Sequence, residues 1–313
     1  MNSRPQALSE YITPVELSEL VNRALAEDVG PGDVTTIGAL GARGSETVSA
    51  TLRVKVNGVV AGCDVFTATF QACDERVRCE WRVADGGSVS SGQELARVEG
   101  PLSALLAGER TALNFFGRMS GVATLTARFV SRIAGTNCKI LDTRKTLPGL
   151  RTLDKYAVIC GGGLNHRYGL YDMALIKDNH ITAAGSLTRA FEATRAYLTS
   201  DACLARFNSL SWSTRDDIEV EVKNETELRE ALSVGARHVL LDNQTPETLR
   251  KLTLIAREFG KSVGQQVTLE ASGGVTVENV SAFAASGVDY ISVGAITHSA
   301  PWLDVSLKID LPS

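Results

Sequence analysis

The sequence predicts an α/β protein: an incomplete α/β barrel preceded by a smaller N-terminal α+β sandwich domain. Two observations lead to this fold class. Through the second half of the chain, short apolar runs alternate with helical segments, a pattern typical of a parallel sheet. Polar or glycine residues follow every run, as they do at the mouth of a barrel. Fewer than eight such runs are visible, so the predicted barrel is incomplete.

The first third of the chain predicts the α+β unit. Residues 14–28 carry a helical apolar face, with Pro14 at the first helical position after Thr13. Strand patterns follow, broken by Asn-Gly and Gly-Gly turn sequences, and a helical stretch near 63–72 interrupts them. The predicted strands cover residues 47–56, 77–83 and 94–98.

The sequence pattern changes after Gly100-Pro101, from short strands to helices and separate apolar runs. Two helices are predicted over 102–116 and 121–133. The apolar runs expected to form the parallel sheet are 139–142, 174–176, 218–222, 238–241, 267–269 and 290–293. We therefore expect an N-terminal domain over 1–118 and a barrel over 119–302, with the segment 303–313 returning to the first domain.

Composition and charge narrow the class of protein. A chain of 313 residues can bury a full core, and its net charge of −4 argues against a general binder of nucleic acid or membrane surfaces. The six cysteines show neither C-x-x-C pairs nor zinc spacing, which favours free thiols in a reducing compartment. Residues 1–20 lack a signal-peptide pattern, and no run reaches membrane-spanning length. We expect a cytoplasmic protein.

Residues 161–180 hold the densest group of chemically useful side chains. Three glycines lead to His166 and Arg167, and the apolar run that follows ends at Lys177. Charged residues just past a buried strand belong to the mouth of the sheet rather than to its core. Two cations, an imidazole and a flexible loop suit a small ligand with several negative charges.

Five cations occupy positions that a barrel mouth would use. A single arginine or lysine there is usually only solvated, but a group combines guanidinium forks for carboxylates with ammonium charges for phosphates. Together they favour a ligand that carries both kinds of anion. The five are Arg110, Arg144, Lys145, Arg167 and Lys177.

Acids and glycines complete the pattern. Glu221 and Asp242 stand at successive strand ends, with Glu219 and Asp178 as weaker candidates. Such acids either balance neighbouring cations or hold Mg²⁺, which takes one or two carboxylates plus substrate oxygens. The late glycine-rich loops at 272–274 and 294–295 lie where barrels bind phosphate. His180, His238 and His298 have ordinary interpretations, with His180 as a cap or packing residue.

At this point the chain resembles a known family, the quinolinate phosphoribosyltransferases, also called nicotinate-nucleotide pyrophosphorylases (carboxylating). The resemblance runs in order from about residue 15 to residue 310, and such a multi-part match is far more specific than one motif. The matching segments are 27–28, 32–36, 109–114, 142–151, 161–180, 218–222, 241–243, 270–274 and 293–299.

The resemblance implies an activity and roles for the residues. The family joins quinolinate to phosphoribosyl pyrophosphate with Mg²⁺, giving nicotinate mononucleotide, pyrophosphate and CO₂ in NAD biosynthesis. It implies that Lys145 faces the pyrophosphate and that Glu221 and Asp242 hold Mg²⁺ and the ribose hydroxyls. The implied quinolinate pocket consists of Arg110, Thr143, Arg144, His166, Arg167 and Lys177. The implied 5′-phosphate site consists of Ser272, Gly273, Gly294 and Ala295.

The resemblance also implies an assembly. Arg110 lies in the helical stretch before the barrel, and the family docks this part of one subunit over the barrel mouth of another. We therefore expect a homodimer or a larger assembly such as a hexamer, without a nucleic-acid or membrane partner. Two departures stand out: Leu147 replaces a common polar residue, and residues 202–216 form a longer segment that we expect to be a surface excursion.

Three other functions remain open from the sequence. A related phosphoribosyltransferase acting on nicotinate would need fewer cations than the cluster around Arg144 and Arg167 provides. The homologue found beside molybdenum-transport genes is disfavoured by the complete segments 109–114 and 142–151. A non-catalytic phosphometabolite-binding protein would need the phosphate loops but not Lys145, Glu221 and Asp242.

Overall fold

A computed structural model of the chain describes residues 7–207 and 218–310. It divides into two compact units. The first unit contains the chain up to Ala127, Thr146–Gly163 and the segment from Ile296 onwards, and the second contains Arg128–Lys145 and Leu164–Ala295. The boundary expected at 118/119 falls inside a single helix, and the limits of the two domains stay a prediction.

An antiparallel sheet in the order β12-β1-β5-β3 forms the framework of the first unit. Each predicted strand range overlaps one of its strands, and β5 runs three residues beyond the range predicted for it. β12 pairs with β1 so that Leu307 lies opposite Leu52, which brings the C-terminal segment into the N-terminal sheet. The strands are β1 (Thr47–Val54), β3 (Arg78–Trp81), β5 (Glu94–Pro101) and β12 (Val305–Asp310), beside a separate pair, β2 (Gly58–Val59) and β4 (Ser88–Val89).

Local signals explain where the first helices begin. α1 (Pro14–Asp28) starts with a capping box, in which Glu16 N–H donates to Thr13 Oγ1 at 3.3 Å and the Glu16 carboxylate accepts from Thr13 N–H at 2.9 Å. α2 (Val34–Leu40) begins where Asp33 accepts two backbone amides. The other helices that lie wholly or mostly in this unit are α3 (Cys63–Cys73), α4 (Leu102–Arg132), α5 (Arg151–Cys160) and α12 (Ala295–His298), with 3₁₀ turns at Leu8–Glu10 and Gly41–Ser45.

The prediction of two helices over 102–116 and 121–133 was wrong, because α4 is continuous. Its interior glycines serve close packing rather than a break in the helix. A Cβ added at Gly121 would lie 3.0 Å from the carbonyl carbon of Pro301, and one at Gly117 would lie 3.2 Å from the Leu303 carbonyl oxygen. Leu303 N–H also donates to the Gly117 carbonyl at 2.9 Å. Glycine within a helix costs about 1 kcal/mol relative to alanine, which this close backbone approach offsets.

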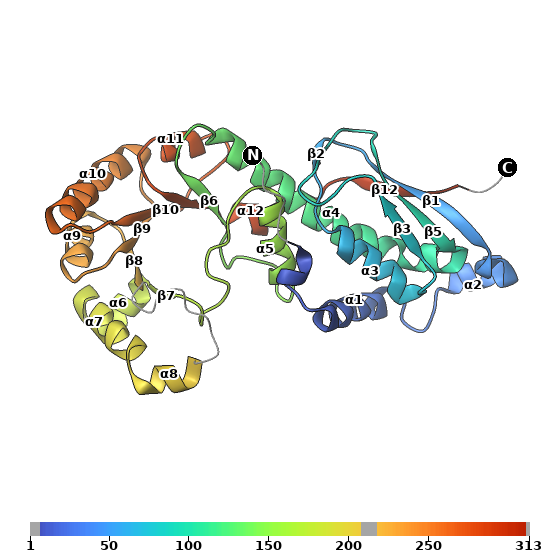
Figure 1. The fold of residues 1–313 in the computed structure, drawn as a ribbon, viewed down its shortest axis with the longest axis horizontal. Helices are drawn as coiled ribbons and strands as arrows, with labels where there is room; N and C mark the ends of the chain where they lie inside the picture. The colour runs from blue at the N-terminus through green and yellow to red at the C-terminus, as the bar shows by residue number, and fades with distance from the viewer. Residues whose placement is uncertain (1–6, 208–217, 311–313) are drawn as a thin grey trace. The chain divides into compact units, whose positions relative to one another are not determined.

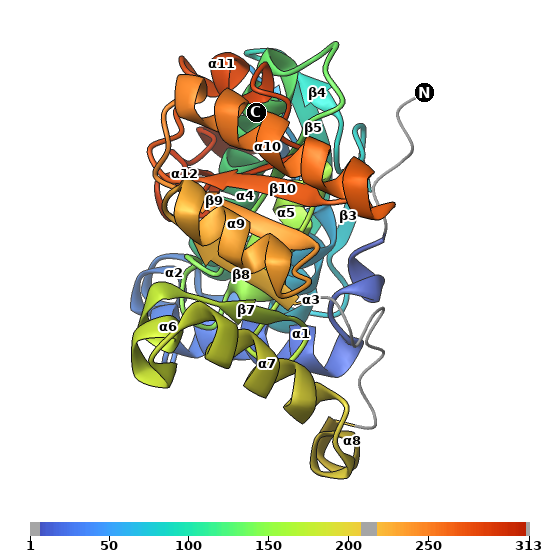
Figure 2. The same cartoon turned by 90° about the vertical axis from the view of Figure 1, so that its left-hand side faces the viewer.

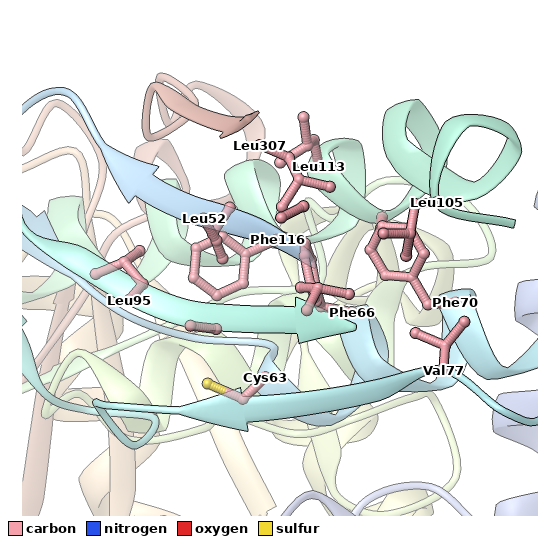
Figure 3. Close-up of a cluster of buried hydrophobic side chains, with 14 of the residues drawn as sticks. Leu52, Cys63, Phe66, Phe70, Val77, Leu95, Leu105, Leu113, Phe116 and Leu307 are labelled. Carbon is pink, nitrogen blue, oxygen red and sulfur yellow. The ribbon is translucent and has the colours of Figure 1, made fainter. Parts of the chain in front are cut away.

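The core of the first unit lies between the sheet and helices α3 and α4, as Figure 3 shows. Phe66 is at its centre, with its ring in edge-to-face contact with the rings of Phe70, Trp81 and Phe116. Leu52 and Leu95 cover this group from the sheet and are fully buried. The helical stretch predicted near 63–72 is therefore the helix that fills the core.

A parallel sheet in the order β6-β11-β10-β9-β8-β7 forms the framework of the second unit (Figure 1). All six predicted runs are strands of this sheet, and the unit is an incomplete barrel, as expected. The strands are β6 (Lys139–Leu141), β7 (Ala174–Ile176), β8 (Ile218–Val222), β9 (His238–Asp242), β10 (Thr268–Ser272) and β11 (Tyr290–Ser292).

Amphipathic helices cover the outside of this sheet. Figure 2 shows α9 and α10 lying across β8, β9 and β10. The helices of this unit are α6 (Asp178–Ala184), α7 (Leu187–Leu198), α8 (Asp201–Phe207), α9 (Glu225–Ser233), α10 (Pro246–Val263) and α11 (Val280–Ala284). Of the surface excursion expected over 202–216, only the part up to Phe207 is described, and residues 208–217 lie outside the described residues.

The edge strands β6 and β7 each pair with a single neighbour among the described strands. Beside β6, Leu164 makes an isolated parallel bridge with Leu141. This bridge fixes the start of the segment that carries His166 and Arg167 against the open edge of the barrel. Within the described ranges, no helix is both long enough and apolar enough to cross a membrane.

Candidate active site

The structure places every candidate site residue except Arg110 in the second unit. Each of them lies near or just beyond the carboxyl end of a strand, and these ends share one edge of a parallel sheet. Arg110 lies exposed on α4 in the first unit. All the residues predicted from the sequence therefore lie along one edge of the sheet, except Arg110. The residues at the edge are Thr143, Arg144, Lys145, His166, Arg167, Lys177, Glu221, Asp242, Ser272, Gly273, Gly294 and Ala295.

Asp142 anchors the loop after the three glycines. Its carboxylate is fully buried and accepts hydrogen bonds from His166 N–H and Asn165 Nδ2, both at 2.8 Å. On the same chain segment, Thr143 Oγ1 accepts from Lys145 N–H at 3.1 Å. The carboxylate directly after β6 thus holds the histidine segment in place. The sequence argument gave Asp142 no role, although its position before Thr143-Arg144 was a usable signal.

His166 lies between two buried carboxylates. Its Nε2 is 3.1 Å from Glu219 Oε2 and 3.4 Å from Glu270 Oε2. Burial would lower the pKa of His166, but hydrogen bonds to Glu219 and Glu270 outweigh burial and raise the pKa to about 10. Burial also raises the pKa of Glu270, and the charge of Glu219 adds to the rise. The cluster therefore retains protons that isolated groups would release.

The backbone specifies which ring nitrogen carries the first proton. Arg167 N–H donates to His166 Nδ1 at 2.7 Å, so Nδ1 acts as an acceptor and the proton belongs on Nε2. A second proton on Nδ1 would have to displace this amide, which opposes the pull of the carboxylates. The contact with the Arg167 amide and the contacts with the two carboxylates therefore both require a proton on Nε2. Glu219, a weaker metal candidate in the sequence, is a partner of His166, and His166, Glu219 and Glu270 place three possible ligand atoms within 4.8 Å of one another.

Arg144 and Arg167 bring two positive charges together. Burial lowers the pKa of Arg167, and the charge of Arg144 lowers it further. Both side chains are half-buried, and Arg167 Nη1 donates to the Met173 carbonyl at 3.1 Å. Arg167 and His166 line a cavity of about 230 Å³ inside the second unit, together with Leu141, Leu164, Asn165, Met173, Glu219, His238, Thr268, Glu270 and Tyr290. The two neighbouring guanidinium groups favour an anionic ligand, and Arg167 is the one of them that lines this cavity.

The acids at the mouth divide into two kinds. Lys177 and Glu221 form an ion pair in which the lysine is 43% exposed and the glutamate 9%. Asp178, a weaker metal candidate, instead pairs with Lys223 at 2.8 Å on the surface, which suits simple charge balance. His180 Nδ1 accepts from Lys177 N–H at 2.9 Å and caps α6, one of the two ordinary roles expected of it.

The glycine-rich end of β10 forms a turn with an unusual backbone conformation. Gly273 and Gly274 adopt positive φ angles of 94° and 66°, a conformation that side chains rarely tolerate. Asn279 Nδ2 donates to the Gly274 carbonyl at 2.9 Å, and Asn279 Oδ1 accepts from Thr276 N–H at 2.8 Å. These hydrogen bonds give the loop after Ser272 a fixed shape.

Sequence reasoning missed a buried ion pair in the first unit. Arg118 holds Asp154 with two hydrogen bonds, Nε to Oδ1 at 3.0 Å and Nη2 to Oδ2 at 2.9 Å. Asp154 also accepts from Leu147 N–H at 3.3 Å, and Arg118 donates to the Thr297 carbonyl. Burial raises the pKa of Asp154, and Arg118 opposes the rise. The pair anchors the loop at Leu147, whose own side chain is 40% exposed.

Comparisons with known proteins identify the family. The model of the quinolinate phosphoribosyl transferase N-terminal domain matches residues 33–120, and that of the C-terminal domain matches residues 122–308. The chain is 40% identical over 297 residues to a protein of Bacillus subtilis named as a probable nicotinate-nucleotide pyrophosphorylase (carboxylating), with 95% of this chain and 94% of the relative covered. It is also 40% identical to the nicotinate-nucleotide pyrophosphorylase (carboxylating) of Mycobacterium leprae, over 93% of this chain and 96% of the relative.

A solved structure agrees with the sequence matches. The nicotinate-nucleotide pyrophosphorylase from Francisella tularensis superposes with a TM-score of 0.84 at 34% identity, covering 99% of this chain and 100% of that one. Both family models and full-length relatives therefore span nearly the whole sequence, including the sheet edge with its cations and acids. The chain belongs to the quinolinate phosphoribosyltransferase family.

Proposed function

We infer that this chain transfers the phosphoribosyl group of phosphoribosyl pyrophosphate to quinolinate, with decarboxylation, to give nicotinate mononucleotide, pyrophosphate and CO₂ in NAD biosynthesis. Membership of the family over nearly the whole chain supports this function. The observation that carries it is the pair of half-buried cations, Arg144 and Arg167, whose like charges act on each other. Such a pair suits a dicarboxylate better than a single carboxylate.

The proposed roles follow the position of each residue along the sheet edge. Arg144, Arg167 and Lys177, with Thr143 beside them and Arg110, bind the two carboxylates of quinolinate, and His166 lines the pocket. Lys145, exposed at the end of the loop after β6, faces the pyrophosphate. Ser272, Gly273, Gly294 and Ala295 offer backbone N–H groups to the 5′-phosphate, as glycine-rich barrel loops do.

The donor set at the ends of β8 and β9 fits Mg²⁺. Val222 pairs with Leu241 in these neighbouring parallel strands, so Glu221 and Asp242 flank one register position and offer the hard oxygen ligands that Mg²⁺ prefers. These two residues would hold the ion together with substrate oxygens. When bound, Mg²⁺ supplies positive charge to the pyrophosphate oxygens.

The chain's own residues then account for the chemistry. Lys145 stabilises negative charge as the pyrophosphate leaves, an electrostatic contribution that often dominates catalysis. The arginines hold quinolinate by its carboxylates so that the ring nitrogen faces the ribose carbon as it acquires oxocarbenium character. Bond formation makes the pyridine ring cationic, so loss of the 2-carboxylate as CO₂ leaves an ylid that the ring nitrogen stabilises and that a proton quenches. No separate decarboxylation cofactor is needed for this step.

A pyrophosphate-release assay tests this proposal. With phosphoribosyl pyrophosphate and Mg²⁺ present, we expect release with quinolinate and none with nicotinate. Equal turnover of nicotinate would contradict the dicarboxylate assignment. If phosphoribosyl pyrophosphate bound without any turnover, the chain would instead be a phosphometabolite-binding protein. Arg144→Lys gives a matched variant, since it keeps the charge but loses the guanidinium fork, and we expect weaker quinolinate binding.

Assembly and location form part of the same proposal. We expect a homodimer or a larger assembly in which Arg110 of one subunit serves the site of another, as a two-fold dimer permits. Mixing Arg110→Ala with Lys145→Ala under subunit exchange should restore activity, because some mixed sites contain both wild-type residues. Heterodimers without recovered activity would limit Arg110 to its own chain. We expect a cytoplasmic location, which the six free cysteines support.

A further inference from the structure

Asn243, at the turn after β9, combines several unusual features. It is the residue directly after Asp242, and its φ of +52° is the only positive value among the non-glycine residues that the structure describes. Asparagine tolerates this left-handed conformation better than most residues, but glycine adopts it more readily. The presence of asparagine rather than glycine therefore calls for a function of its side chain.

Asn243 joins the ends of two neighbouring strands, β9 through its side chain and β10 through its backbone. Its Nδ2 donates to Asp242 Oδ2 at 2.8 Å, which orients the carboxylate at the end of β9. Its backbone N–H donates to the Ser272 carbonyl at the end of β10, also at 2.8 Å. One residue thus fixes the direction of Asp242 and the distance from it to the glycine-rich loop.

Gly273 is shaped to receive this side chain. A Cβ added at Gly273 would lie 2.7 Å from Asn243 Cγ and 3.1 Å from its backbone nitrogen, closer than real Cβ atoms normally approach. The absence of a side chain at position 273 therefore admits the amide of Asn243. The left-handed turn at Asn243 and the glycine at position 273 together allow the ends of β9 and β10 to pack closely.

Gln244 extends the contact to a third strand. Its Nε2 donates to the Lys223 carbonyl just after β8 and to the Asp242 carbonyl, both at 2.8 Å. The pair Asn243-Gln244 therefore links the ends of β8, β9 and β10. These ends carry Glu221 and Asp242, which the proposed function assigns to Mg²⁺, and Ser272, which it assigns to the 5′-phosphate.

We propose that Asn243 is a positioning residue for the phosphoribosyl half of the site: its amide holds the Asp242 carboxylate in the orientation that binds phosphoribosyl pyrophosphate and its metal. This inference rests on the proposed function. Asn243 acts through Asp242 and needs no direct contact with the substrate. The quinolinate half of the site, built on the segments after β6 and β7, does not depend on it.

Asn243→Gly tests the amide separately from the backbone, because glycine adopts φ of +52° without strain. We expect the dissociation constant for phosphoribosyl pyrophosphate, measured by calorimetry at saturating Mg²⁺, to rise roughly three- to tenfold, because the variant loses the bond that orients Asp242 but keeps the carboxylate itself. The Mg²⁺ concentration at half-maximal activity should rise as well. The dissociation constant for quinolinate and the thermal midpoint should stay unchanged.

Asn243→Asp separates hydrogen-bond donation from shape. Aspartate has nearly the same size and also tolerates the left-handed region, but it places an acceptor beside Asp242 Oδ2. We expect phosphoribosyl pyrophosphate to bind this variant more weakly than it binds the wild type. If both Asn243→Gly and Asn243→Asp bound it as the wild type does, the residue would serve the turn alone, and the proposal would be overturned.

A double-mutant cycle shows whether Asn243 works through Asp242. On an Asp242→Asn background, Asn243→Gly should cause little further loss of phosphoribosyl pyrophosphate binding, since the carboxylate it orients is already gone. A full additional loss would contradict the positioning role. Failure of the proposed function gives a different result: the wild-type chain itself would not bind phosphoribosyl pyrophosphate or release pyrophosphate with quinolinate.

Discussion

The two units use buried arginine in opposite ways. In the first unit, Arg118 meets Asp154 with two hydrogen bonds, and their side chains are only 8% and 1% exposed. In the second unit, Arg167 is half-buried near Arg144, whose charge lowers its pKa. Arg118 stabilises the loop anchored at Leu147, whereas the second pair gathers positive charge that a ligand can neutralise. Burial of an arginine therefore does not by itself indicate a functional role. A second positive charge beside it, in place of a carboxylate, does.

The largest expected effect is on stability and concerns Arg118. Arg118→Ala leaves the buried Asp154 carboxylate without its partner, so we expect a loss of about 3–5 kcal/mol in the free energy of unfolding, measured with denaturant. The matched control is Arg82→Ala, which removes an ion pair to Glu94 whose arginine is 51% exposed and should cost about 1 kcal/mol or less. Equal losses in the two variants would remove the contrast between buried and exposed pairs.

The second prediction concerns a residue that should affect catalysis but not the stability of the fold. Lys145→Ala should lower kcat by about a hundredfold or more, because the Lys145 charge acts mainly on the leaving pyrophosphate. The KM for quinolinate and the free energy of unfolding should change little, since Lys145 is exposed. Steady-state kinetics beside a denaturant titration check both halves. A change confined to the KM for quinolinate would show that Lys145 belongs to the quinolinate pocket.

The third prediction sharpens the comparison directly. Arg167→Ala should weaken quinolinate binding by about 1.5–3 kcal/mol, the usual worth of a hydrogen bond to a charged group. Unlike Arg118→Ala, it should cost little stability, because it removes one of two like charges. Calorimetric binding and thermal unfolding on the same sample provide the test. A stability loss as large as that of Arg118→Ala would mean that Arg167 is a structural residue.

The sequence predicted the sheet edge well because the relevant signals are local. Each buried strand is a short apolar run, and polar residues at its end mark the mouth whatever the partner strands are. α4 was mispredicted because Gly117 and Gly121 look like a break, whereas they meet residues 301–303, far away in sequence. Arg118 and Asp154 were missed for the same reason, since 36 positions separate them. Contacts between distant segments leave no local pattern.

His166 shows the same limit within the candidate site. Its loop suggested a ligand contact, but nothing near it in sequence announced Glu219 and Glu270. The two carboxylates come from β8 and β10, and only the parallel sheet brings them to one side chain. The resemblance to a family supplied roles for the residues at the mouth, and the geometry adds the supporting partners behind them.

The smallest expected effect is the pH dependence of this cluster. The folded-state pKa of His166, about 10, lies above its ordinary value of 6.5, so its contribution to stability is fully present below pH 6.5 and is lost as the pH rises through 10. The raised pKa of Glu270 acts with the same sign. Because a second proton on His166 competes with the Arg167 amide for Nδ1, we expect only about 1 kcal/mol from this source.

Unfolding free energies measured between pH 6.5 and 10 check this prediction. The wild-type value should fall with rising pH, whereas His166→Asn, which removes the titrating ring, should give a flatter profile. A wild-type profile that rises over this range would contradict the assignment, because it would mean that the folded cluster binds fewer protons than the unfolded chain. Identical slopes in both proteins would place the titration in other groups. His166 would then not be the group that titrates in this range, and its contacts with Glu219 and Glu270 would not hold its proton.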